Sequence, residues 1–165
     1  EPQSEIYLFL LTSDENLILP TIKSRAQQVH FPKKQAYLTE RLEKEGLIKS
    51  QASLVARFSF SLEEAEQQKK NATFFELAKV CNQFIERCHS NLNSAYLEVT
   101  RLVSLADDKE KQSQAFRLME LALEEQLRLS RSQQLLEKLS LARTMWKANV
   151  SFQNALEYMV LSLES

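Results

Sequence analysis

The chain contains very few residues that interrupt a helix. Its 165 residues include one glycine, Gly46, and three prolines, and these two residue types carry the largest cost inside a helix. We therefore predict a mainly α-helical protein. The single glycine also excludes a glycine-rich phosphate-binding loop, and the pattern GxxxxGK[ST] is absent from the sequence.

Three short helices are expected in residues 33–71. Gly46 stands at a natural position just past the end of the first helix, and Ser50 is expected to cap the second. Ser61, followed three residues later by Glu64, forms a capping box for the third. Helices of this length favour a small three-helix domain that ends near residue 71.

From residue 72 to residue 165, apolar residues recur at the spacing of one helix face. The stripes predict five amphipathic helices that bury one another as a self-sufficient bundle. Trp146 is expected to point inward with the other stripe residues. The residues expected to begin or recap these helices are Asp107 or Asp108, Ser132, Asn149 and Ser151.

A buried strand is expected before the helices. Ile6 to Leu11 form a short, continuous apolar run, as in a strand covered on both faces of a parallel sheet. Thr12 and Ser13 would then emerge at the carboxyl edge of the sheet, where open α/β sheets bind ligands. A short helix opened by Pro20 should follow, and then a second short strand at Val29 to Phe31.

The helix opened by Pro20 leads into Ser24 and Arg25, and this order of features resembles a known family. The stretch LTSDENLILPTIKSRAQ is similar to the sensor-1 strand and Ser-Arg-Cys motif of AAA+ clamp-loader subunits. It looks most like the delta-prime subunits of bacterial DNA polymerase III, although Ala26 stands where the family usually has cysteine. The last helix, NVSFQNALEYMVLSL, resembles the final collar helix of the same family.

The resemblance implies a division of the chain into three parts. Residues 1–32 would be the end of an AAA+ α/β core, residues 33–71 a helical lid and residues 72–165 a helical collar that mediates oligomerisation. The expected fold is thus mainly α with a remnant edge of an α/β core. The chain would be a C-terminal fragment of a larger subunit.

The resemblance also implies roles for four residues. Arg25 would act as an arginine finger in trans, directed at ATP on the neighbouring motor subunit, and Ser24 would position it. A guanidinium suits this role because its planar fork binds two phosphate oxygens at once. Thr12 and Ser13 would correspond to sensor-1 residues. A local salt bridge from Arg25 to Asp14 or Glu15 is the structural alternative.

Within the family that the chain resembles, one motif distinguishes a motor subunit from a stator. Motor subunits of the family place Gly-Gly-x-Arg-Asp at the start of the third lid helix, whereas this chain has Phe60 to Ala65, without glycine or arginine. We therefore expect a delta-prime stator with no cofactor or metal of its own, and with ATP and magnesium in the neighbouring subunit. Expected partners are the gamma/tau and delta subunits, the sliding clamp and, through the complex, primed DNA.

Two other interpretations remain open: a gamma/tau motor subunit, and an unrelated helical adaptor. No enzymatic activity is expected of the chain alone, although it resembles a subunit of the DNA polymerase III holoenzyme, a DNA-directed DNA polymerase and nucleotidyltransferase. The net charge of −1 argues against an autonomous nucleic-acid binder.

The cysteines and histidines favour structural roles over redox or metal-binding roles. Cys81 and Cys88 fall on one apolar helix face, as expected of buried thiols in a reducing cytosol. His30 and His89 are too isolated to predict a metal site. With no signal peptide and no apolar run near 20 residues, we expect a soluble, cytoplasmic protein without membrane contact.

Overall fold

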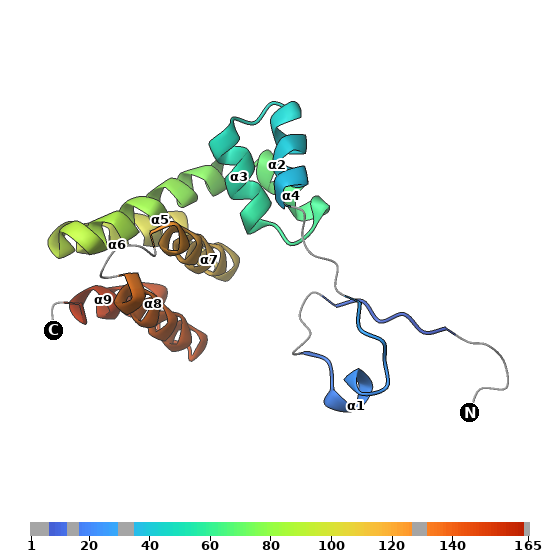
Figure 1. Ribbon diagram of the computed structural model, residues 1–165. Helices are drawn as coiled ribbons and strands as arrows, with labels where there is room; N and C mark the ends of the chain where they lie inside the picture. The colour runs from blue at the N-terminus through green and yellow to red at the C-terminus, as the bar shows by residue number, and fades with distance from the viewer. Residues whose placement is uncertain (1–6, 13–16, 30–34, 127–131, 164–165) are drawn as a thin grey trace. The chain divides into compact units, whose positions relative to one another are not determined.

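The structure, a computed structural model, describes residues 7–12, 17–29, 35–126 and 132–163. Within these ranges it contains nine helices, α1 to α9, and no strand. The mainly helical fold predicted from the sequence is thereby confirmed. The chain divides into two compact units, Glu1–Lys34 and Gln35–Ser165 (Figure 1).

Among its described residues, the first unit contains one short α-helix, α1 (Pro20–Lys23). It begins with proline at its first position, where the missing N–H costs nothing and the fixed φ angle suits a helix. The Ser24 backbone N–H donates to the Pro20 carbonyl at 3.0 Å and closes the turn. The predicted short helix before Ser24 and Arg25 is therefore confirmed.

The predicted strand at Ile6 to Leu11 is wrong for the residues that the structure describes. Residues 7–12 have no regular secondary structure, and their side chains are exposed, Leu11 by 93%. A strand needs a neighbouring backbone to accept and donate its ladder hydrogen bonds, and none of the described residues supplies one. Val29 is not in a strand either, while Ile6, His30 and Phe31 lie outside the described residues.

The second unit begins with α2 (Gln35–Lys44), α3 (Lys49–Phe58) and α4 (Leu62–Lys69). Gly46 has a φ of 101°, a left-handed conformation that glycine adopts without strain. The Gly46 N–H donates to the Glu43 carbonyl at 3.0 Å, and the Leu47 N–H donates to the Leu42 carbonyl at 3.1 Å. This pair of bonds is the Schellman motif, and it confirms the predicted end of the first helix of this unit.

The other two helix starts differ in how they are capped. The Ser61 hydroxyl accepts from the Glu64 N–H at 3.1 Å, and the Glu64 carboxylate accepts from the Phe60 N–H at 2.5 Å. The predicted pairing of Ser61 with Glu64 is confirmed. Ser50 is not the cap of α3, because that helix begins at Lys49 after Ile48, which makes no side-chain capping bond.

Five further helices complete the unit, as the apolar stripes predicted. They are α5 (Ala72–Ser90), α6 (Leu92–Leu105), α7 (Lys109–Glu125), α8 (Ser132–Lys147) and α9 (Phe152–Leu161). Their N-caps with side-chain hydrogen bonds are Asn71, Asn91, Asp108 and Ser151. Asn149 has a φ of 68° and interrupts the chain between α8 and α9, as predicted.

The core of the second unit runs through all of its helices. On α5, for example, seven side chains are buried, including Phe74, Phe84 and both cysteines. Burying one large apolar side chain stabilises a fold by about 1.5–3 kcal/mol. Around Phe116 of α7, the rings of Trp146 and Phe152 lie at centroid distances of 5.5 Å and 5.3 Å.

Trp146 is partly buried and packs against this core, in line with its predicted inward position. Its indole Nε1 donates to Gln112 Oε1 at 2.8 Å. A tryptophan often keeps such a polar bond by lying at the edge of a core, with one end apolar and the other hydrogen-bonded.

Candidate functional site

Arg25 lies directly after α1, in the turn that ends it. Its backbone N–H donates to the Ile22 carbonyl at 3.1 Å, and its side chain is exposed. The end of the helix therefore fixes the backbone of Arg25 while leaving the guanidinium accessible. A guanidinium held in this way can donate a bidentate pair of hydrogen bonds to an anion that arrives from outside the chain.

Ser24 acts on the same turn through its hydroxyl, which donates to the Thr21 carbonyl at 3.2 Å. The bond satisfies one of the carbonyls that a helix end leaves open. Ser24 thus holds the backbone that carries Arg25, and the sequence-based expectation of a positioning role stays a prediction.

Of the two sensor-1-like residues, the structure describes only Thr12, which is exposed and is not in a strand. Ser13 lies outside the described residues. The carboxylates considered as local partners of Arg25, Asp14 and Glu15, also lie outside them.

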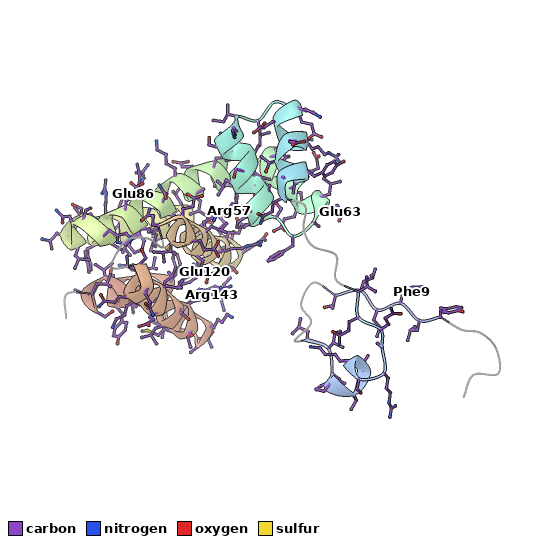
Figure 2. The ribbon with its side chains drawn as sticks, viewed as in Figure 1. Phe9, Arg57, Glu63, Glu86, Glu120 and Arg143 are labelled. Atoms are coloured by element: carbon purple, nitrogen blue, oxygen red, sulfur yellow. The ribbon has the colours of Figure 1, made fainter. Side chains whose placement is uncertain are left out.

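The first unit exposes many large apolar side chains. Phe9, labelled in Figure 2, is one of them. Among the described residues of this unit, the set is Tyr7, Leu8, Phe9, Leu10, Leu11, Leu17, Leu19, Ile22 and Val29. Apolar surface on this scale is typical of a segment that another protein surface covers.

The first turn of α4 carries two carboxylates. Glu63 and Glu64 occupy the first turn of the helix, where its N-terminal dipole favours negative charge. Glu64 also lies 3.5 Å from the Arg117 guanidinium of α7. These acidic residues are therefore explained by the stability of α4 and its contact with α7.

Two arginines that sequence reasoning missed connect α3 and α4 to α7. Arg57 of α3 donates to the Leu121 carbonyl at 3.2 Å and pairs with Glu124 and Glu125. Arg117 of α7 lies over the rings of Phe58 and Phe60. The partners are about sixty residues apart in sequence, so no local pattern could have indicated these contacts.

The two cysteines are buried, as predicted. The Cys81 thiol donates to the Ala115 carbonyl at 3.6 Å. Burial raises the pKa of Cys81, and it raises the pKa of Cys88 to about 12. Since the thiolate is the nucleophile and the metal ligand, neither residue is placed for redox or metal chemistry at neutral pH.

Two further properties of the described residues bear on ligand and membrane binding. Within residues 7–12, 17–29, 35–126 and 132–163, no three histidine, cysteine or acidic side chains gather as a metal site. Over the same ranges, none of the helices has the length and apolar character needed to cross a bilayer.

Comparison with known proteins connects the first unit to a family. Residues 1–36 match the family model described as DNA polymerase III, delta subunit. Neither the curated proteins nor the solved structures gave a match. The matched segment includes Thr12, Ser24 and Arg25, the residues on which the resemblance rests. Over these N-terminal residues, the chain is similar to the delta-subunit family of DNA polymerase III, and the match supports a relation to the clamp-loader subunits of DNA replication.

Proposed function

We propose that this chain is part of a clamp-loader stator subunit of the delta-prime type, which acts in DNA replication in the cytoplasm. The observation that carries the proposal is the family match over residues 1–36. It coincides with the segment in which an exposed Arg25 follows α1. In this role the chain helps a multisubunit complex to load the sliding clamp onto primed DNA.

Arg25 supplies positive charge to the ATP site of a neighbouring motor subunit. In phosphoryl transfer, an arginine donated in trans offsets the charge that develops on the transferred group and changes the rate by ~10³–10⁵-fold. Two features support this role: the guanidinium is exposed, and the Ser24 hydroxyl bond to Thr21 holds its backbone. ATP and magnesium belong to the motor subunit, and Arg25 approaches them only after assembly.

The exposed apolar side chains of residues 7–29 support the expectation that this unit is covered in the assembled protein. The remainder of an AAA+ core would cover Tyr7 to Leu11. The gamma/tau and delta subunits are the proposed partners. Contacts with the sliding clamp and primed DNA are made by the complex as a whole.

A stator is favoured over a motor subunit by the start of α4. Glu63 and Glu64 would repel a triphosphate at the position where a motor subunit presents arginine. Their engagement in capping and in the contact with Arg117 gives them a structural role.

Nucleotide binding and co-purification test the stator assignment. Calorimetry of the 165-residue chain with Mg-ATP at micromolar concentrations should show no saturable binding, because the chain has no phosphate-binding loop and no lid arginine. The full-length subunit should co-purify with motor and delta subunits. Saturable ATP binding would contradict the stator role, and a full-length protein that never joins the other subunits would contradict membership of the complex.

A further inference from the structure

The helices of the second unit form two groups joined by a short link. The three-helix group is α2–α4, and the five-helix group is α5–α9. Only Lys70 and Asn71 lie between α4 and α5, and Figure 1 shows the three short helices gathered beside the start of α5. A two-residue link alone does not fix the orientation of one group relative to the other, so other contacts must do so.

An apolar contact close to this link supplies a pivot. The rings of Phe58 of α3 and Phe74 of α5 meet edge to face, with centroids 4.8 Å apart, and both are buried. This edge-to-face contact occupies one point near the link, and polar contacts between the three-helix group and α7 add to it.

The first such contact runs from the three-helix group to α7. Arg57 donates to the Leu121 carbonyl at 3.2 Å, pairs with Glu124 at 3.2 Å and also pairs with Glu125. The carboxylate partners are 58% and 63% exposed, so water and salt weaken these pairs.

The second contact runs in the opposite direction, from α7 to the three-helix group. The Arg117 guanidinium lies 4.4 Å from the centroid of the Phe58 ring and 3.6 Å from that of Phe60. Glu64 of α4 lies 3.5 Å from the same group. The Arg117 side chain is only 20% exposed, and a partly desolvated guanidinium on an aromatic face binds more strongly than an exposed one.

We propose that Arg57 and Arg117 form a two-sided joint that fixes the orientation of the three-helix group on α7, with Arg117 as the dominant half. Each arginine comes from one group and binds residues of the other, so movement of the three-helix group away from α7 breaks at least one of the two contacts. The joint makes α2–α9 one rigid body, and displacement of the three-helix group is transmitted to α7. This inference is independent of the clamp-loader assignment.

A distance measurement between the two groups tests the joint in the full chain. Spin labels are attached through Glu40→Cys on α2 and Thr100→Cys on α6, both exposed positions. The native thiols of Cys81 and Cys88 are buried and should not take up the label. Pulsed dipolar spectroscopy should give a single narrow distance peak for the otherwise unchanged chain.

Four variants separate the joint from general destabilisation. Arg117→Ala should lose the single narrow peak, and Arg57→Ala should broaden it less. Phe60→Ala should also broaden the peak, and it removes a ring that is 62% exposed, so it leaves the core intact. The matched control is Arg143→Ala, which removes an arginine that pairs with Glu120 at 2.6 Å inside the five-helix group (Figure 2).

The control variant should keep the narrow peak. Circular dichroism checks that each variant retains its helices, and if Arg117→Ala does not, the comparison rests on Phe60→Ala. The proposed joint would be overturned if Arg117→Ala and Phe60→Ala, wherever they retain their helices, keep the narrow distance peak at its original position. A broader peak for Arg57→Ala than for Arg117→Ala would overturn the order of the two halves.

Discussion

Arg57 and Arg117 carry the same charge in two different environments. Arg57 pairs with exposed carboxylates, and such pairs contribute about 0.2–1 kcal/mol each. Arg117 is stacked on Phe58 and Phe60, where a cation over aromatic rings contributes about 0.5–2 kcal/mol according to its desolvation. Burial lowers the pKa of Arg117, while Glu64 and Glu120 oppose that shift. The guanidinium nevertheless stays charged at neutral pH.

A surface charge network between α2 and α4 should make stability depend on pH. Glu45 accepts hydrogen bonds from Lys69 at 2.7 Å and from Arg41 at 3.0 Å. These two bonds lower the pKa of Glu45 below its ordinary value of 4.5. A lowered carboxyl pKa gives a stabilising contribution that is complete above the unfolded pKa and is lost as the pH falls through the folded one.

We therefore expect Glu45→Gln to be less stable than the unchanged chain at neutral pH, with the difference shrinking between about pH 5 and about pH 3. Urea unfolding at several pH values measures this difference. Glu76→Gln, which alters an exposed carboxylate on α5, is the control and should follow the unchanged chain more closely. A difference that stays constant across this pH range would rule out the ion pairs as its source.

At the scale of helices, single capping residues decide where one element ends and the next begins. Asn91 ends α5 and begins α6, and its side-chain oxygen accepts from the Ser94 N–H at 3.1 Å. Asn71 caps the start of α5, where its side-chain oxygen accepts from the Phe74 N–H. Such caps allow long helices to follow one another in a chain with so little glycine.

Asn91→Ala should lower the free energy of unfolding by about 1 kcal/mol, the usual cost of an N-cap removed. Urea denaturation followed by circular dichroism measures the change. Asn93→Ala is the matched control, because Asn93 is exposed within the first turn of α6. Equal losses in the two variants would show that the capping bond of Asn91 contributes little.

The sequence could predict the helices because their signals are local. Apolar spacing identified α5–α9, and Gly46, Ser61 and Ser151 act within one helical turn of their own positions. The strand at residues 6–11 failed because an apolar run does not supply its own hydrogen-bonding neighbour. The hydrogen bond of Trp146 could not be predicted, because its partner Gln112 lies thirty-four residues away.

In the candidate site, too, features set by neighbouring residues could be predicted and contacts between distant residues could not. The turn that presents Arg25 could be predicted, because Pro20 and Ser24 specify it within a few residues. The contacts of Arg57 and Arg117 could not be, because they depend on how α3 and α4 pack on α7. Periodicity shows which face of a helix is buried, but it does not identify the helix that covers it.

At the scale of the whole molecule, the two units differ in how much of their apolar surface is buried. The described residues from 35 to 163 bury most of theirs in a shared core, whereas the described residues between 7 and 29 expose most of theirs. The same N-terminal segment carries the family match and Arg25. On the proposed function, this unit is the part of the chain whose contacts form in the assembled clamp loader.

Steady-state ATP hydrolysis by the reconstituted complex, stimulated by DNA and the sliding clamp, tests this account most directly. Arg25→Ala in the full-length subunit should leave folding and assembly intact, because its side chain is exposed. Hydrolysis should slow by up to ~10³-fold at the site that Arg25 serves. Arg25→Lys should restore little activity, because a point charge does not reproduce the bidentate fork, and Lys23→Ala should retain the normal rate. An Arg25→Ala complex that assembles and hydrolyses ATP at the unchanged rate would contradict the proposed role in trans.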